Sequence, residues 1–211
     1  MESKTEATAL IILLIIVFGM LILALKDFFS FNANKTNVVS YQKNIQSSMQ
    51  FNFMDDELAK DERSKSANIG ALGSQHIHAD FKIFINGNSI NFADDKHYMK
   101  SNIIHLDNQQ NKEDASGLIH MHATGVPFWY FLKSIGIDLD KECITPEYQQ
   151  KFCNSTNKKL RFFINGKEHP DIGNYVFRDL DKILVSYGDE NEEQIRNQIS
   201  SITNFAILHR K

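Results

Sequence analysis

The chain has 211 residues, a formal net charge of −3 and a pI near 6.2, so it lacks the basic field that collects nucleic acid. Its 10 glycines are scattered without a Walker or dinucleotide-binding pattern, which argues against a nucleotide-dependent enzyme. We therefore expect no nucleic acid and no nucleotide among its partners.

The first element is an uncharged apolar segment from Ala7 to Leu25, which predicts a transmembrane anchor within residues 1–26. As a helix, this segment spans just under ~30 Å, about the hydrocarbon thickness of a bilayer. A cleaved signal peptide is the alternative, but its apolar core is shorter, at roughly 7 to 15 residues. The run Lys-Asp-Phe-Phe after Leu25 is also a poor cleavage site, so a retained anchor is favoured.

Residues 27–73 are polar, rich in Asn, Gln, Ser and Lys, and free of Pro, which is typical of a stalk or linker. Within this stretch, residues 55–65 are dense in mixed charge and predict a solvated helix. The domain itself is expected over residues 74–190, followed by a C-terminal amphipathic helix over residues 191–211.

Two features of the sequence disagree on the side of the membrane that the domain occupies. Lys26, Lys35 and Lys43 follow the span, and the positive-inside rule would place the domain in the cytoplasm. The two cysteines, Cys143 and Cys153, lie close together in a polar loop, as the partners of a structural disulfide do. We expect a single-pass membrane protein whose C-terminal domain is extracytoplasmic.

The clearest strand begins at Ile77, where apolar and polar residues alternate as far as Ile85. Asn86-Gly87 then predicts a type I′ turn, and residues 89–92 return as the second strand of a hairpin. Further strands are expected at 102–106, 118–123, 160–164 and 183–187.

Two helices complete the predicted domain. Residues 126–135 predict a short buried helix, with Pro127 in its first turn and Gly136 at its end. Residues 191–208 place their apolar side chains on one helical face. The elements together predict an α+β domain dominated by antiparallel hairpins, whose closing strands are β-grasp-like.

The domain contains two His-x-His pairs, which are its candidate metal ligands: His76 with His78, and His120 with His122. Residues i and i+2 of a strand project from one face about 6.5–7 Å apart, so both imidazoles can reach one ion at a Zn–N distance of about 2.0–2.1 Å. Both pairs lie opposite the apolar face of their strands, so they are unsuited to filling the core. The alternative is that they are polar residues on solvated strands, where they titrate near neutral pH.

If these two strands are neighbours, four imidazoles converge, with His105 or Asp80 as a further ligand or as a partner that orients a ligand. His97, His169 and His209 are expected to stand apart from this cluster. Imidazole suits Zn, Cu, Ni and Fe alike, so the residues do not identify the metal. The expected cofactor is Zn or Cu.

The cysteines, Cys143 and Cys153, do not form a CxxC motif, which argues against a redox thiol of low pKa. A structural disulfide is favoured over a redox pair, and zinc ligation by the cysteines is less favoured still. No Gly-x-Ser-x-Gly motif occurs, so nothing indicates hydrolysis beyond a metal-bound water, and enzymatic activity stays open.

The motifs HIHADFKIFING, GLIHMHATGV, KLRFFINGK and DLDKILVSYGDE follow one another between His76 and Glu190. Their order resembles that of a group of largely uncharacterised archaeal membrane-anchored proteins with the pattern HxH, FxING, IHxHA, xFFING and DxDxILISYG. Some of these proteins carry a disulfide-isomerase label, which requires a CxxC that this chain lacks. The resemblance implies an extracytoplasmic domain and says more about its location than about its mechanism.

Three functional hypotheses follow. The first is a membrane-tethered metal-binding domain that holds Zn or Cu. Its expected ligands are His76, His78, His105, His120 and His122. The second is an interaction or structural subunit of a membrane complex, which is favoured if the aromatic residues 128–130 form an exposed patch. The third is thiol–disulfide exchange, which needs an exposed and reducible bond.

Overall fold

The computed structural model describes residues 26, 55–107, 117–147 and 149–209. The predicted anchor at 7–25, the connector as far as residue 54 and the charged loop at 108–116 lie outside these residues. Among the helices that the structure describes, none is long and apolar enough to cross a membrane. The described residues from 55 onward belong to one folded unit.

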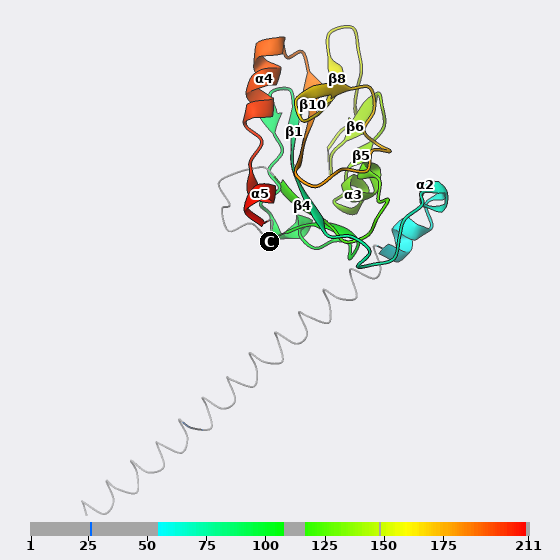
Figure 1. Ribbon diagram of the computed structural model, residues 1–211. Coiled ribbons are helices and arrows are strands. Elements are labelled where there is room, and N and C mark those ends of the chain that lie inside the picture. Colours follow the sequence, from blue (N-terminus) through cyan, green and yellow to red (C-terminus); the bar gives the residue numbers. More distant parts are fainter. Residues whose placement is uncertain (1–25, 27–54, 108–116, 148, 210–211) are drawn as a thin grey trace, which may run out of the picture. The chain divides into compact units, whose positions relative to one another are not determined.

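A seven-stranded sheet forms the centre of this unit, in the order β3–β4–β1–β10–β8–β9, with β2 paired to the end of β1 (Figure 1). Its strands are β1 (Ile77–Ile85), β2 (Asn88–Ser89), β3 (Ile104–Leu106), β4 (Gly117–Met121), β8 (Lys159–Ile164), β9 (Lys167–His169) and β10 (Asp181–Gly188). The central pair, β1 and β10, is parallel, and the other pairings of the described strands in this sheet are antiparallel. The prediction of an α+β domain with a mostly antiparallel sheet is confirmed.

Two Asn-Gly turns, at 86–87 and 165–166, shape the hairpins of the sheet. All four turn residues have positive φ, between 50° and 77°, which is the geometry of a type I′ turn and suits Asn and Gly. The first hairpin is shorter than the predicted return at 89–92, because Phe92 turns into the core. Its ring is 2% exposed and lies 4.8 Å from the ring of Phe81.

The helix α3 (Phe128–Ser134) covers one face of the sheet (Figure 1). Pro127 precedes it and Gly136 follows it with a φ of 81°, as the sequence predicts. The side chains of residues 128–130 are at most 3% exposed and belong to the core. They therefore do not form the exposed aromatic patch that would favour the interaction hypothesis.

The opposite face of the sheet is covered by two helices, α4 (Glu192–Ser200) and α5 (Phe205–His209) (Figure 1). Ile195 and Ile202 pack there against side chains of β8 and β10 in a second, smaller core. The predicted C-terminal helix is confirmed, but it is not continuous over 191–208, because the chain turns after α4 and α5 packs back onto β1 and β4.

A second, small sheet consists of β5 (Asp138–Leu139), β6 (Cys143–Thr145) and β7 (Phe152–Cys153). Cys143 and Cys153 lie opposite each other on β6 and β7 and form a disulfide bond, with their Cα atoms 4.1 Å apart. Closing a loop of this length stabilises a fold by about 2–3 kcal/mol in the chain-entropy model. The predicted disulfide is therefore present as a cross-strand bridge.

Part of the predicted connector packs onto the domain. The residues from 55 to 73 include α2 (Glu62–Ser66) and the side chain of Leu58, which is 2% exposed. Asp55 accepts hydrogen bonds from the amide of Asn102 at 2.9 Å and from the hydroxyl of Tyr130 at 3.3 Å. The segment that was expected to be a solvated helix is thus attached to the domain through an apolar side chain and a carboxylate.

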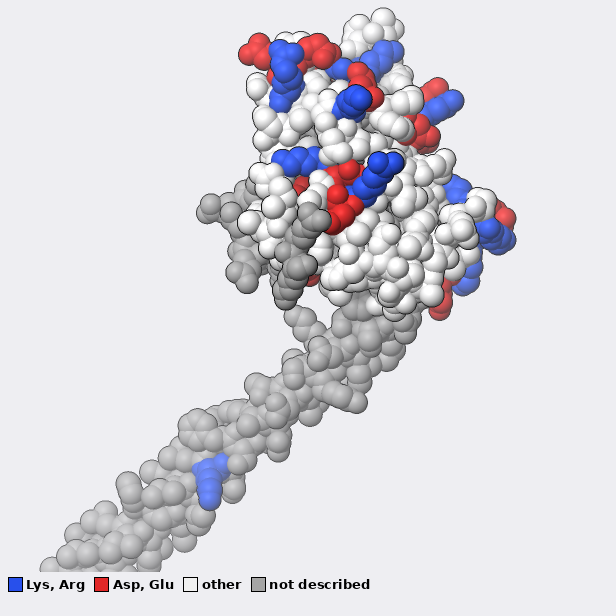
Figure 2. Space-filling model, viewed as in Figure 1, with Lys and Arg blue, Asp and Glu red and all other residues white. Residues whose placement is uncertain are grey.

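The charged side chains on the face shown in Figure 2 are of both signs and are interspersed. This face therefore carries no field of one sign.

Candidate metal centre

Three neighbouring strands bring histidines together on one face of the sheet. His78 of β1 lies opposite His120 of β4, and His105 of β3 lies opposite the same His120. Directly opposite residues have Cβ atoms about 4.5–5.5 Å apart, so three imidazoles form a row across the strands. His76 and His122 lie just outside the strand ends and flank this row.

The five imidazoles that the sequence predicts as ligands lie in one cluster, in which each ring contacts at least two others. The ring centroids are 4.4 Å apart for His78 and His120, 4.7 Å for His76 and His122, and 5.0 Å for His105 and His122. Two triads have ligand nitrogens within 4.8 Å of one another and can each hold a metal ion. The triads are His76, His78 and His120, and His105, His120 and His122. His120 belongs to both.

A sixth imidazole approaches the cluster from α5. The ring of His209 lies 6.4 Å from that of His78 and 6.1 Å from that of His120. The expectation that His209 stands apart is therefore wrong, because α5 turns back over β1 and β4. His97 and His169 do lie elsewhere: His97 follows β2 in the short helix η1 (Asp95–His97), and His169 is exposed on β9.

Asp80 has a role different from the metal ligand or ligand-orienting partner that its position suggested. It is 1% exposed, and its carboxylate accepts hydrogen bonds from the hydroxyl of Thr203 at 2.6 Å and from the amides of Phe205 and Ala206, both at 3.0 Å. A carboxylate at the first turn of a helix satisfies amide groups that have no partner within the helix. Asp80 therefore holds α5, and with it His209, against the sheet.

The orientation of the His105 ring is fixed by the backbone. Its Nδ1 lies 2.9 Å from the carbonyl oxygen of Ser101, and a carbonyl can only accept, so Nδ1 carries the proton and donates. The lone pair of the ring is then on Nε2. Metal-binding histidines usually donate their second nitrogen to a carbonyl or carboxylate in this way.

His120 has a buried ring nitrogen without a partner. The residue is 9% exposed, and its Nε2 has no hydrogen-bond partner among the described residues. A carboxylate oxygen of Asp107 lies 3.4 Å away. Buried polar atoms are rarely left unpaired, so a nitrogen in this situation at the centre of five other imidazoles fits a metal ligand.

Four imidazoles of the cluster have lowered pKa values, which favours their neutral form. Burial lowers the pKa values of His78, His105 and His122. Burial, followed by repulsion from the imidazoles of His78 and His105, lowers the pKa of His120 to about 3. The contact between His120 and Asp107 is therefore not an ion pair near neutral pH. Neutral imidazole is the form that coordinates metal ions.

These pKa shifts predict that the metal-free protein loses stability as the pH falls below about 6.5. In that range the unfolded chain binds protons at imidazoles that stay neutral in the folded chain, so acid favours unfolding. Between pH 6.5 and 4.5 we expect His120 alone to lower the free energy of unfolding by about 2–3 kcal/mol, at about 1.4 kcal/mol per pKa unit. Chemical denaturation of the chelator-treated protein at the two pH values measures this.

The control is His120→Gln, whose side chain does not titrate. In this variant the free energy of unfolding should differ less between pH 6.5 and pH 4.5. Equal free energies of unfolding at pH 6.5 and 4.5 in the native protein would contradict the shift.

Comparison of the chain with protein-family models, curated proteins and solved structures found no match. The chemistry of this site therefore rests on its own residues. Neither cysteine takes part in the site, since Cys143 and Cys153 are bonded to each other in the second sheet.

Proposed function

We propose that this chain is a membrane-tethered, extracytoplasmic protein that binds Zn or Cu through its histidine cluster. The observation that carries the proposal is the convergence of two imidazole triads on His120, whose buried Nε2 has no hydrogen-bond partner among the described residues. A solvated strand face, the alternative explanation for the paired histidines, is disfavoured because His78, His105 and His120 are at most 9% exposed.

The donor set favours a divalent ion. Imidazole ligands suit Zn²⁺ and Cu²⁺, whereas Cu⁺ prefers thiolates and thioethers. Met121 is fully buried on the other face of β4, and both cysteines are in the disulfide, so none of these three residues offers the ion a sulfur ligand. A triad of histidines also leaves coordination positions open.

The arrangement suits the handling of a metal ion better than a defined reaction. Two triads with a common member give an ion two overlapping positions, and His76, a member of the first triad, is exposed to solvent. The apolar segment at 7–25 supports a membrane tether, and the disulfide supports an extracytoplasmic location, since disulfides persist in oxidising compartments.

Elemental analysis of the purified full chain, loaded with Zn²⁺ or Cu²⁺ and then desalted, tests the proposal. We expect at least about one tightly held ion per chain, because three converging imidazoles suffice for a zinc site. The double variant His120→Ala, His122→Ala should lose the ion, whereas His169→Ala, a matched change of an exposed histidine on β9, should retain it. A folded native protein that retains neither metal would refute the proposal.

A further inference from the structure

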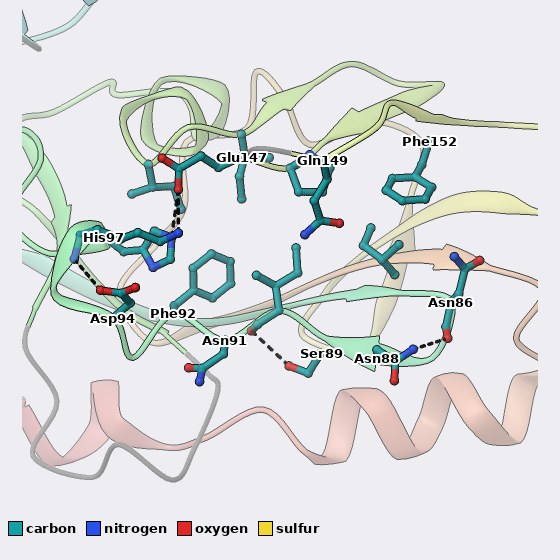
Figure 3. Close-up of a pocket in the computed structure, with 16 residues that line it drawn as sticks. Asn86, Asn88, Ser89, Asn91, Phe92, Asp94, His97, Glu147, Gln149 and Phe152 are labelled. Carbon is teal, nitrogen blue, oxygen red and sulfur yellow. Dashed lines mark hydrogen bonds and ion pairs between the residues drawn. The ribbon is translucent and has the colours of Figure 1, made fainter.

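A second site lies at the other end of β1. The strand begins beside His76 and ends at Ile85, and eight residues at about 3.3 Å each place Asn86 about 25 Å from His78. Here a cleft of about 610 Å³ opens between the β1–β2 hairpin and the chain around Glu147 (Figure 3). Its volume falls in the range of small-molecule sites, about 300–1,000 Å³.

One end of this cleft contains two buried polar atoms that lack hydrogen bonds. His97 is 6% exposed, and its Nδ1 has no hydrogen-bond partner among the described residues. Its Nε2 lies 3.6 Å from Oε2 of Glu147, an oxygen that is also without a hydrogen bond although the ammonium of Lys96 is 3.1 Å away (Figure 3). With its second nitrogen directed at a carboxylate, the imidazole presents Nδ1 as an acceptor. This end of the cleft therefore presents two acceptors, which suit a ligand that donates hydrogen bonds.

The walls of the cleft are rich in carboxamides. They come from Asn86, Asn88, Asn91 and Gln149. A carboxamide both donates and accepts, which matches hydroxyl groups. Gln149 is exposed and its side chain makes no hydrogen bond with another described residue, so its amide is available to a ligand. Apolar side chains, among them Ile137 and Phe152, line the cleft between these amides and can contact the C–H face of a ring.

The charges of the cleft exclude a strongly anionic ligand. The carboxylates of Asp94 and Glu147 line it, and the ammonium of Lys96 is already paired with Glu147. A phosphate or a carboxylate would therefore meet two negative groups and one compensated cation.

We propose that this cleft is a binding site for a neutral saccharide, whose hydroxyl groups donate to His97 Nδ1 and to Glu147 and pair with the carboxamides. The proposal is independent of the metal centre, because none of the six clustered histidines lines the cleft. Burial lowers the pKa of His97, so its imidazole is neutral and keeps an acceptor nitrogen at physiological pH.

Saturation-transfer NMR on the full chain in detergent tests the proposal, with cellotriose, maltotriose and chitotriose as probes and trialanine as the peptide comparison. We expect transfer to at least one trisaccharide and none to the peptide. Gln149→Leu should weaken that binding about tenfold, the loss of roughly one or two hydrogen bonds, whereas Gln150→Leu, the same change one residue outside the cleft, should not.

The variants of His97 separate binding from folding. His97→Phe keeps a ring beside Phe92 but removes the acceptor, and it should abolish transfer. His97→Asn keeps an acceptor near the position of Nδ1 and should retain part of the binding. Absence of transfer to all three trisaccharides would overturn the proposal. Transfer that is unchanged in Gln149→Leu and His97→Phe would also overturn it. Transfer to trialanine alone would overturn it as well and would make the cleft a peptide site.

Discussion

Replacing His120 by alanine should weaken metal binding more than replacing any other histidine of the cluster. His120 is common to both triads, so its loss leaves each triad with two imidazoles. Loss of a residue that only orients a ligand typically costs about 10–100-fold in affinity, and loss of a shared ligand should exceed this range. Competition with a chromophoric chelator measures the dissociation constant for Zn²⁺.

His76→Ala and His105→Ala are the matched comparisons, because each removes a member of one triad only. Either single change should leave the other triad complete and therefore weaken binding less than His120→Ala does. The double variant His76→Ala, His105→Ala should weaken Zn²⁺ binding nearly as much as His120→Ala does. If His76→Ala alone weakens binding as much as His120→Ala, the two triads do not act as alternative positions, and one ion uses ligands from both.

The stability of these variants has to be measured beside their affinity. His120 is 9% exposed, and its truncation leaves a cavity in a packed site. His120→Gln fills more of that space and still lacks the imidazole. A loss of metal that appears in both His120 variants, with an unchanged cooperative unfolding transition, therefore reports on coordination rather than on folding.

Much of the candidate metal centre could be predicted from the alternation of side chains along two strands. The period of two places His76 with His78, and His120 with His122, on one face whatever the rest of the fold, and the structure brings the two pairs together as neighbours. The Asn-Gly turns were equally readable, because few other residue pairs accept two consecutive positive φ angles.

The covering of that face could not be predicted from the strands. Polar residues at alternate positions indicate a solvated face, yet Lys82 is only 8% exposed, and α4 and α5 cover this face of the sheet. Phe84 and Leu184 are apolar residues on the same face, and they indicate that this face is covered. The apolar side of α4 is the partner they require.

Two further features of the candidate metal centre could not be predicted from the sequence. The partner that orients His105 is the carbonyl oxygen of Ser101, and a backbone group has no signature in the sequence. His209 lies far from the other histidines along the chain, and its approach depends on the turn between α4 and α5, which the apolar spacing of residues 191–208 concealed.

Replacing Asp80 by alanine should destabilise the domain by about 3–5 kcal/mol, because hydrogen bonds to a buried charged group contribute about 1.5–3 kcal/mol each. The change leaves the amides of Phe205 and Ala206 and the hydroxyl of Thr203 without their acceptor. Denaturant titration measures the loss. Asp80→Asn keeps one oxygen acceptor but places an amide donor against donors, so it should be intermediate.

The decisive readout for Asp80 is local. If its carboxylate holds α5 on the sheet, hydrogen exchange at the amides of Phe205 and Ala206 should accelerate in Asp80→Ala more than exchange in α4 does. Zn²⁺ affinity should then fall as far as it does in His209→Ala, because the sixth imidazole leaves with the helix. Asp189→Ala, an exposed carboxylate after β10, serves as the control. Exchange that rises uniformly across the domain would instead make Asp80 a determinant of global stability, with no separate hold on α5.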